Sequence, residues 1–433
     1  MNRHILASLI TLAAVVAVPL AAAQQSGVER TDQPTPAAPL AIKPAPAAEI
    51  EDIAAMLAPI LKKHDLPAMG IIVLDGNTVI ARGVTGVRKR GAPDLATLDD
   101  QWHLGSCAKA ITATVMATLV DDGTLAWHTS PAMVFRDDIQ SIQAAWGKVT
   151  LEQLLSHRAG APADLDAHGL WASLVKRDGT PAQQRMQLVR GVITHPPTGF
   201  PGHQYIYSNA GYAIAGAMGE KLTGKAWEDL ARERVLTPLG ITSAGFGAPG
   251  TAVRGDGEAI NQPRGHVLSG KAVEPGAGAD NPPAIAPAGT MHMTLDDWAR
   301  FVGFHLTGSA RSDAPGLRLS EDSLRSLLTS MGRTNAKDAD GYAMGWMVTR
   351  RPWATPKKGA APNEPDGADD IEAEQGGRVL THAGSNTVWF CAAWLAPQKQ
   401  MAVLVVCNQG GPRAAKATDE AAGAAIKKFV ANR

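Results

Sequence analysis

Strand-like sequence stands at both ends of this chain, and helix-like sequence fills the middle. Near the N-terminus, β-branched runs at residues 68–74 and 78–87 flank Asp75-Gly76-Asn77, whose turn chemistry is typical of a hairpin. Further strand-like runs follow near the C-terminus, at residues 341–349, 378–383, 387–395 and 401–407. We therefore expect an α+β fold with one antiparallel sheet built from both chain ends, flanked by helices, and an all-helical inserted subdomain.

Helical periodicity supports this layout. Apolar residues recur at helical spacing from Glu49 to Ile60. Residues 104–120 form a largely apolar run that ends at Asp121-Asp122-Gly123, and apolarity nearly all round a helix predicts burial between layers. Residues 414–430 predict a helix that closes the domain.

The first 48 residues precede the predicted domain. Residues 1–23 have a short polar start, an apolar stretch and a small-residue exit at Ala21-Ala22-Ala23, which are the parts of a cleavable signal peptide. The apolar stretch is shorter than the roughly 20 residues that span a bilayer. We expect export to the periplasm or the medium, without stable membrane insertion after cleavage; an uncleaved anchor is the alternative. Residues 24–48, rich in Pro and Ala, predict a linker.

One domain is predicted over residues 49–430. Its sheet part comprises residues 49–129 and 335–430, and its helical part comprises residues 130–334. Within the sheet part, residues 352–377 contain Pro, Gly, Lys and acidic residues, and this composition predicts a mobile surface insertion. Nothing in the sequence specifies an oligomeric state.

Charge and ligand spacing exclude several function classes. Lys and Arg number 41, as do Asp and Glu, and no basic cluster is interleaved with aromatic residues, so a nucleic-acid partner is not expected. The twelve His lack metal-ligand spacing, and no phosphate-binding Gly-rich loop ends in Lys-Ser or Lys-Thr. We predict no metal site and no cofactor.

The chain has three cysteines, Cys107, Cys391 and Cys407. An odd number does not make a disulfide scaffold. Cys391 and Cys407 lie on neighbouring predicted strands, where they can approach each other. The favoured interpretation is that they are buried small apolar residues.

The strongest candidate for chemistry is the pair Ser106 and Lys109, at the start of the apolar helix. Residues i and i+3 share one face of a helix, so the lysine amine can accept the serine proton. The helix N-terminus adds free N–H groups that favour a developing oxyanion. Ser173 and Lys176 repeat the spacing, but a lysine on an almost wholly apolar helix needs a partner, and this favours Lys109.

Two further segments carry polar groups suited to the same chemistry. Tyr207 and Asn209 flank Ser208, and in extended backbone they point the same way, as a phenol that relays protons and an amide that holds a substrate. The alternative is a packed tyrosine and a helix-capping asparagine. Near the C-terminus, His382 precedes Gly384-Ser385 on a predicted strand, where glycine permits close approach of a substrate. A structural histidine is the alternative there.

Taken together and in this order, these segments resemble the serine β-lactamase and DD-peptidase family, the penicillin-recognising serine hydrolases. The branch most similar in pattern includes class C β-lactamases, D-alanyl-D-alanine carboxypeptidases, D-aminopeptidases and related esterases. The resemblance covers roughly residues 49–430. It includes the flanking phrases at residues 66–68, 154–160 and 341–346.

The resemblance implies a β-lactamase/transpeptidase-like fold and a role for each matched residue. Ser106 is the acylated nucleophile, Lys109 its proton acceptor or electrostatic partner, and Tyr207 the acid/base toward Ser106 and the leaving group. Asn209 holds the acyl side of the substrate. The implied substrate is a small molecule or a peptidoglycan-derived fragment.

The C-terminal motif implies the rest of the site and contains one departure. His382 and Gly384 contact the substrate, and the N–H groups of Ser106 and Ser385 form the oxyanion hole. Many family members have Lys-Thr-Gly or His-Thr-Gly where this chain has His382-Ala383-Gly384. Imidazole is only partly charged near neutral pH, and Ala383 lacks the hydroxyl that holds a substrate carboxylate. Arg350, Arg351 and Arg378 are candidates for the missing charge.

The sequence therefore predicts an exported serine hydrolase acting through an acyl-enzyme on an amide, β-lactam or ester bond. The alternatives are a carboxylesterase without β-lactamase activity and a non-catalytic protein that binds penicillin or cell-wall fragments. Retention of the serine, lysine, tyrosine and asparagine argues against the non-catalytic alternative.

Overall fold

The computed structural model describes residues 50–166, 169–252, 259–334, 341–356 and 376–431. The predicted signal peptide at residues 1–23 and linker at residues 24–48 lie outside the described residues, as does most of the predicted insertion at residues 352–377. At the ends of that insertion, Pro352–Ala354 form a 3-10 turn and the next strand begins at Gly377.

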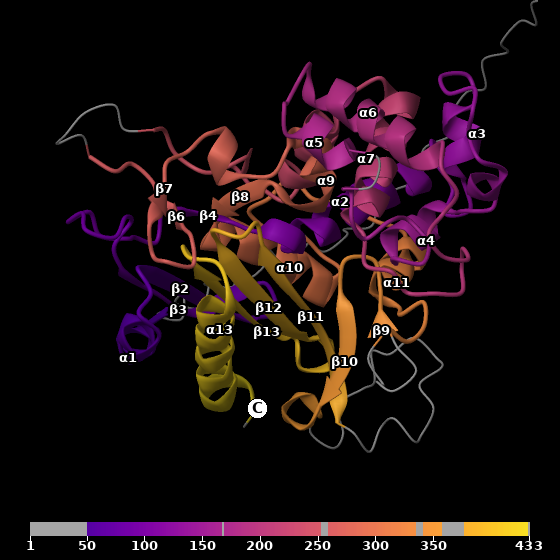
Figure 1. Cartoon of the computed structure of the whole chain (residues 1–433). Helices are drawn as coiled ribbons and strands as arrows, with labels where there is room; N and C mark the ends of the chain where they lie inside the picture. The colour runs from indigo at the N-terminus through magenta and orange to yellow at the C-terminus, as the bar shows by residue number, and fades with distance from the viewer. Residues whose placement is uncertain (1–49, 167–168, 253–258, 335–340, 357–375, 432–433) are drawn as a thin grey trace, which may run out of the picture. The chain divides into compact units, whose positions relative to one another are not determined.

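The central element is an eight-stranded sheet with the strand order β1-β3-β2-β13-β12-β11-β10-β9. The strands are β1 (Glu51–Asp52), β2 (Ala68–Asp75), β3 (Thr78–Gly86), β9 (Gly341–Tyr342), β10 (Met347–Arg351), β11 (Gly377–Ser385), β12 (Phe390–Ala396) and β13 (Met401–Cys407). Strand β13 pairs with β2, with Val405 opposite Ile71. The prediction of one sheet built from both chain ends is confirmed (Figure 1).

The sheet differs from the prediction at two places. It is mixed, because β1 pairs with β3 in parallel, and a two-residue strand leaves no alternation in the sequence to predict it. The run at residues 341–349 forms two strands, β9 and β10. Gly345 separates them with φ +92°, and a Cβ there would lie 2.5 Å from the Ala110 Cα, so the chain bends tightly against the buried helix.

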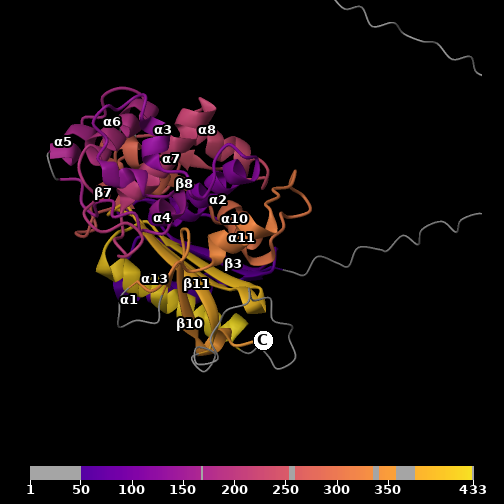
Figure 2. The same cartoon turned by 90° about the vertical axis from the view of Figure 1, so that its right-hand side faces the viewer.

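Helices cover both faces of the sheet. Helices α1 (Ala54–His64) and α13 (Pro412–Ala425) contact each other and share one core cluster with Ile71 of β2. The opposite face of β2, with Ile72, packs in a second cluster with α2 (Ala108–Asp121) and α10 (Leu295–Thr307). Figure 2 shows α13 on one side of the strands and α10 on the other.

The inserted part is built from helices without strands only in its first half. Its helices are α3 (Pro131–Phe135), α4 (Leu151–Leu155), α5 (Leu170–Leu174), α6 (Pro181–Ile193), α7 (Asn209–Thr223) and α8 (Trp227–Ala231), followed later by α9 (Ala286–Gly289), α10 and α11 (Glu321–Leu328). The expectation of an all-helical insertion is wrong beyond α8. Strands β5 (Gly245–Phe246) and β8 (Met291–Thr294) join β4 (Gln101–His103) in a small sheet, and β6 (Gly265–His266) pairs with β7 (Ala272–Val273). These strands are too short for a readable alternation.

Helix α2 is buried from Ala108 to Leu119, which confirms the prediction for the apolar run. Its polar residues have partners: the Thr112 hydroxyl donates to the Pro287 carbonyl at 2.6 Å, and the Thr114 hydroxyl donates to the Ala110 carbonyl at 2.8 Å. In the described part of the chain, no helix combines the length and apolarity that a membrane span requires.

Candidate active site

Ser106 lies on a short 3-10 turn, Gly105–Cys107, that leads directly into α2. Gly105 has φ +47°, a conformation that favours glycine, and a Cβ there would lie 2.3 Å from the Ser385 nitrogen. A Cβ on Gly384 would lie 2.0 Å from the Leu104 carbonyl oxygen. The backbone of β11 therefore lies directly against the turn, and the structure brings Ser106 and Ser385 together as the oxyanion prediction requires.

Lys109 lies one helical turn after Ser106, and its side chain is fully buried. Its Nζ is 3.1 Å from the Ser106 Oγ, 2.8 Å from the Asn209 Oδ1 and 2.8 Å from the Ala288 carbonyl oxygen. A neutral amine has two N–H groups and one lone pair. Because the amide oxygen and the carbonyl only accept, they take both N–H groups, and the lone pair is left for the Ser106 hydroxyl proton.

Burial lowers the pKa of the Lys109 amine to about 7. Desolvation disfavours the ammonium form, and the described residues place no carboxylate against the nitrogen to offset it. A substantial fraction of the amine is then neutral near neutral pH. The geometry and the pKa both suit a proton acceptor for Ser106.

Tyr207 and Asn209 both lie next to the Lys109 amine. The Lys109 Nζ is 4.9 Å from the centroid of the Tyr207 ring. Burial raises the pKa of the Tyr207 phenol, while hydrogen bonding with Ser106 lowers it in part, so the phenol keeps its proton at neutral pH.

Ser208, with extended backbone, caps α7 by accepting the Gly211 N–H, and this corrects the alternative that Asn209 is the cap. The Asn209 Oδ1 accepts a hydrogen bond from Lys109, so the Nδ2 group of Asn209 is the part suited to bind a substrate.

His382 lies near this group, with its ring centroid 6.3 Å from that of Tyr207. It is only 5% exposed, and both ring nitrogens have partners. The Nδ1 lies 2.7 Å from the Ala383 carbonyl, which only accepts, and the Nε2 lies 3.1 Å from the Tyr342 hydroxyl. In the neutral ring, these partners place the proton on Nδ1 and leave Nε2 to accept from Tyr342. Both nitrogens of His382 are therefore engaged by the protein, whereas the lysine of the family motif is a donor for the substrate.

None of the three candidate arginines replaces that donor. Arg350 pairs with Arg378 at the opposite end of β11, six residues before Gly384, or roughly 20 Å along a strand. Arg351 donates to the Thr349 hydroxyl at 2.5 Å, and Arg378 donates to the Leu328 carbonyl. The suggestion that one of them supplies the missing charge is wrong, because the strand direction carries them away from the site.

Close packing requires glycine at position 384, and this requirement was not visible in the sequence. Besides the clash with Leu104, a Cβ at Gly384 would lie 2.9 Å from the Cys391 Sγ. The glycine lets β11 approach the nucleophile turn, whether or not a substrate also lies against it. The second Ser-x-x-Lys pair, Ser173 and Lys176, lies elsewhere, and Lys176 is exposed, as its interpretation as a solvated helix face requires.

Sequence reasoning missed an aromatic cluster around His157. The chain has four tyrosines, and all four rings surround this histidine. The centroid distances from His157 are 5.8 Å to Tyr205, 4.2 Å to Tyr207, 5.2 Å to Tyr212 and 4.6 Å to Tyr342. The scarcity of tyrosine and the phrase at residues 154–160 were the available signals.

His157 is neutral, because burial lowers its pKa well below the ordinary value. Its Nδ1 accepts the Ser208 N–H at 3.1 Å, which ties it to the segment between Tyr207 and Asn209. The cluster excludes water from one side of Lys109 without adding a negative charge. This aromatic cluster contributes to the desolvation that lowers the pKa of Lys109.

The cysteines are unpaired and buried. Cys391 and Cys407 lie on opposite faces of the sheet, in different core clusters, so the alternative of a disulfide between them is wrong. Instead, the Cys391 Sγ lies 3.5 Å from the Cys107 Sγ, next to the nucleophile turn. Within the described ranges, no group of three His, Cys, Asp or Glu side chains is arranged to hold a metal ion.

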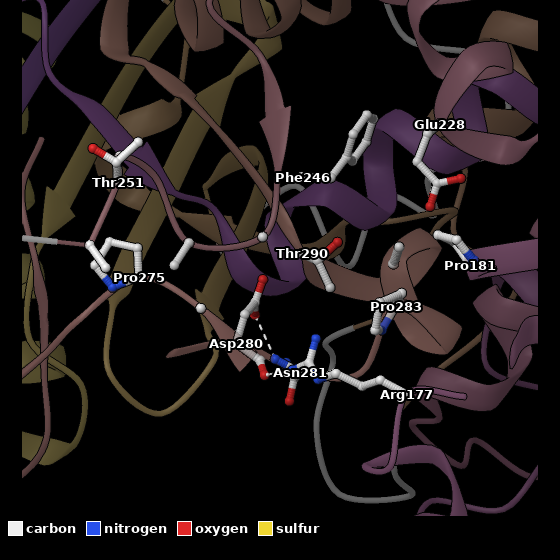
Figure 3. A pocket seen from close by; sticks show the side chains of 16 residues that line it. Arg177, Pro181, Glu228, Phe246, Thr251, Pro275, Asp280, Asn281, Pro283 and Thr290 are labelled. Carbon is white, nitrogen blue, oxygen red and sulfur yellow. Dashed lines mark hydrogen bonds between the residues drawn. The ribbon is translucent and has the colours of Figure 1, made fainter. Parts of the chain in front are cut away.

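A cavity of about 510 Å³ lies within the inserted part and is lined by residues from both of its halves (Figure 3). Arg177, Phe246, Asp280, Asn281 and Thr290 are among the residues that line it. Thr290 directly follows Gly289, where a Cβ would lie 3.2 Å from the Ser106 nitrogen. One wall of the cavity is thus formed by the segment that packs on the nucleophile turn.

Comparison with known proteins gives a family match over most of the chain. The family model described as Beta-lactamase matches residues 53–427. The chain also superposes on the octameric penicillin-binding protein homologue from Pyrococcus abyssi with a TM-score of 0.63 and 20% identity. That superposition covers 86% of this chain and 76% of the other. At this identity the likeness shows the fold.

Three relatives are similar in sequence. The chain is 30% identical over 257 residues to "Unguisins hydrolase ungD'" of Aspergillus campestris, covering 58% of this chain and 46% of that protein. It is 29% identical over 292 residues to "Penicillin-binding protein 4" of Amycolatopsis lactamdurans, covering 66% and 72%. It is 28% identical over 165 residues to "Lovastatin esterase" of Penicillium rubens, covering 34% and 40%. The matches thus span less than half of the first and third relatives.

Proposed function

Because this chain belongs to the Beta-lactamase family of serine hydrolases, we propose that it is exported and hydrolyses its substrate through an acyl-enzyme on Ser106. The observation that carries the proposal is the contact between the Ser106 Oγ and the Lys109 Nζ, at 3.1 Å, with the other two positions around the nitrogen occupied by acceptors. A nucleophile beside an amine of lowered pKa is the arrangement that acylation needs.

The proposed reaction begins with proton transfer from Ser106 to the Lys109 lone pair as the Ser106 Oγ bonds to the substrate carbonyl carbon. The carbonyl oxygen becomes an oxyanion that accepts from the N–H groups of Ser106 and Ser385. When the tetrahedral intermediate breaks down, the leaving group takes a proton from Tyr207, and Lys109 returns its proton to Tyr207. Water then attacks the Ser106 ester and releases the acid, with the same groups moving the proton.

The proposed substrate is an ester or amide of low negative charge, either a small molecule or a peptidoglycan-derived fragment. His382 is engaged by Tyr342 and Ala383, and Ala383 has no hydroxyl, so the site lacks two donors for a substrate carboxylate. Losing a charge-assisted hydrogen bond costs about 1.5–3 kcal/mol. A carboxylesterase without β-lactamase activity is therefore the second candidate. A non-catalytic protein that binds penicillin or cell-wall fragments is the third.

A labelling experiment tests the proposal. Wild-type protein is treated with a fluorescent fluorophosphonate and, separately, with a fluorescent penicillin, and the modified peptide is mapped. We expect a covalent label on Ser106 and none on Ser106→Ala. Turnover of nitrocefin and of p-nitrophenyl acetate then separates a β-lactamase from an esterase. Absence of any label on folded wild-type protein would favour the binding protein.

Export is proposed from residues 1–23 and is tested independently. Expression of the full chain in a Gram-negative host should give periplasmic protein whose N-terminus is Gln24. Recovery of uncleaved protein in the membrane fraction would support the uncleaved anchor instead.

A further inference from the structure

A buried histidine–aspartate pair lies behind the turn that carries Ser106. His103 is the last residue of β4, and Asp280 follows a short 3-10 turn at Ala277–Ala279. The His103 Nε2 lies 2.9 Å from the Asp280 Oδ2, and the two side chains are 0% and 2% exposed. Neither residue belongs to a motif that the reaction above uses.

The second nitrogen of His103 fixes the proton arrangement. The Gly105 N–H donates to the His103 Nδ1 at 3.1 Å, so that nitrogen is an acceptor and bears no proton. The ring proton is on Nε2, which donates to Asp280. The pair thus holds the backbone amide of the residue immediately before Ser106.

Asp280 connects this amide to the other predicted oxyanion donor. Its Oδ1 accepts from the Asn281 N–H at 2.8 Å and from the Asn386 Nδ2 at 3.0 Å. Asn386 follows Ser385, is 5% exposed, and accepts the Trp389 N–H at 3.2 Å. One continuous chain of hydrogen bonds therefore runs from the nucleophile turn to the end of β11.

Asp280 also borders the cavity in Figure 3, where its bond to the Asn281 N–H is drawn. Both carboxylate oxygens, however, already accept from protein donors. A buried carboxylate with this set of partners serves the protein framework, and it leaves no free oxygen for a ligand in the cavity.

We infer that His103 and Asp280 are positioning residues that set the spacing between the N–H groups of Ser106 and Ser385. The inference rests on the proposed function of those two amides. Donors held in advance stabilise an oxyanion because they need no reorganisation when charge develops. The pair acts through Gly105 and Asn386, and it touches neither the nucleophile nor a substrate.

Two amide substitutions test the contacts of the two His103 ring nitrogens one at a time. In His103→Asn the side-chain oxygen takes the place of Nδ1 and still accepts the Gly105 N–H. In His103→Gln the amide NH₂ takes the place of Nε2 and still donates to Asp280, but Gly105 loses its acceptor. In Asp280→Asn, one oxygen becomes an NH₂ group that faces a donor from His103, Asn281 or Asn386.

The measured quantities are kcat and KM for p-nitrophenyl acetate, the rate of fluorophosphonate labelling, and hydrogen exchange of the peptide containing Gly105. We expect His103→Gln and Asp280→Asn to lower kcat by roughly 10- to 100-fold with KM within about threefold, and to speed that exchange. His103→Asn keeps an acceptor for the Gly105 N–H but loses the link to Asp280, so it should lower kcat by a similar factor while the exchange at Gly105 stays near that of wild type. His292→Asn is the matched control, because His292 is the cross-strand neighbour of His103 and its Nδ1 lies 2.8 Å from the Gly247 carbonyl.

The outcomes separate this inference from the proposed function. A wild-type kcat in either His103→Gln or His103→Asn would overturn the inference, as would wild-type exchange at Gly105 in His103→Gln. Unchanged hydrolysis in Ser106→Ala would instead overturn the assignment of the nucleophile. The exchange measurement reports on Gly105 in either case, because it does not depend on turnover.

Discussion

At the scale of single residues, the reactivity of Lys109 follows from its surroundings more than from its spacing to Ser106. The same spacing at Ser173 and Lys176 leaves the lysine exposed. At Lys109, burial lowers the pKa to about 7, and two acceptors take its N–H groups. The chemistry therefore depends on what the rest of the chain brings to this nitrogen.

The pH profile of hydrolysis tests this account. A proton acceptor must be neutral, and lowering the pKa of an amine extends its neutral form to lower pH. We expect kcat/KM for p-nitrophenyl acetate to rise with pH through a limb centred near 7, which is the pKa of Lys109. Lys109→Arg, which stays protonated, should lose about 100-fold or more at every pH. A flat wild-type profile between pH 5 and pH 9 would contradict the assignment.

Tyr207→Phe should separate substrates by their leaving groups. The phenol is protonated because burial raises its pKa, so it can donate to a leaving nitrogen. An amide or β-lactam substrate should lose about 100-fold or more in kcat, as is typical when a general acid is removed. A p-nitrophenyl ester should lose much less, since nitrophenolate leaves without a proton. Equal losses on both substrate types would assign Tyr207 to another step.

The sequence predicted which residues meet, but only part of what each one does. Ser106 and Lys109 meet Tyr207 and Asn209 because α2 and α7 contact each other and the four residues lie at or next to the starts of these helices. The engagement of His382 by Tyr342 was not predictable, since those residues are forty positions apart and no motif joins them. The same holds for the pair His103 and Asp280.

At the scale of elements, the turn before α2 is held by contact of backbone with backbone. Gly105→Ala places a Cβ 2.3 Å from the Ser385 nitrogen, whereas Gly123→Ala, just beyond the end of the same helix, meets nothing within 4 Å. Both glycines have positive φ, so both substitutions incur a similar cost of roughly 1–2 kcal/mol in backbone conformation.

We expect Gly105→Ala and Gly123→Ala to have similar backbone costs but very different activities. Gly105→Ala should abolish fluorophosphonate labelling, because the turn and β11 must separate. Gly123→Ala should be labelled at nearly the wild-type rate, with a slightly lower unfolding temperature. Comparable labelling of both variants would show that the close approach of the turn and β11 is not needed.

Element boundaries show where pattern-based prediction ends. Strands β2 and β13 were predicted because their long apolar runs are buried on both sheet faces, and β3 was predicted because turn residues join its β-branched run to β2. Strand β1 has two residues, and β9 is separated from β10 by a bend against α2, so tertiary packing determines both. The signal peptide, the linker and the domain boundaries at residues 129 and 335 stay predictions.

At the scale of the whole molecule, the site depends on a sheet that both chain ends must complete. The described residues from 50 to 431 belong to one compact unit, and α13 packs on β13 and on β12, the neighbour of β11 in the sheet. Ala421 of α13 is fully buried against this face, whereas Ala424 on the same helix is half-buried. The last helix therefore supports a nucleophile more than 300 positions earlier in the sequence.

Ala421→Asp should destabilise the entire unit, because it places an unpaired carboxylate in the core at a cost of roughly 3–5 kcal/mol. Ala424→Asp should cost about 1 kcal/mol or less, since its carboxylate can reach water. Urea unfolding followed by far-UV circular dichroism and by residual fluorophosphonate labelling should give one shared midpoint, lowered strongly only in Ala421→Asp. If labelling survived to urea concentrations at which the circular dichroism of that variant was already lost, the helical part would hold the site without the sheet. The chain would then be two cooperative units.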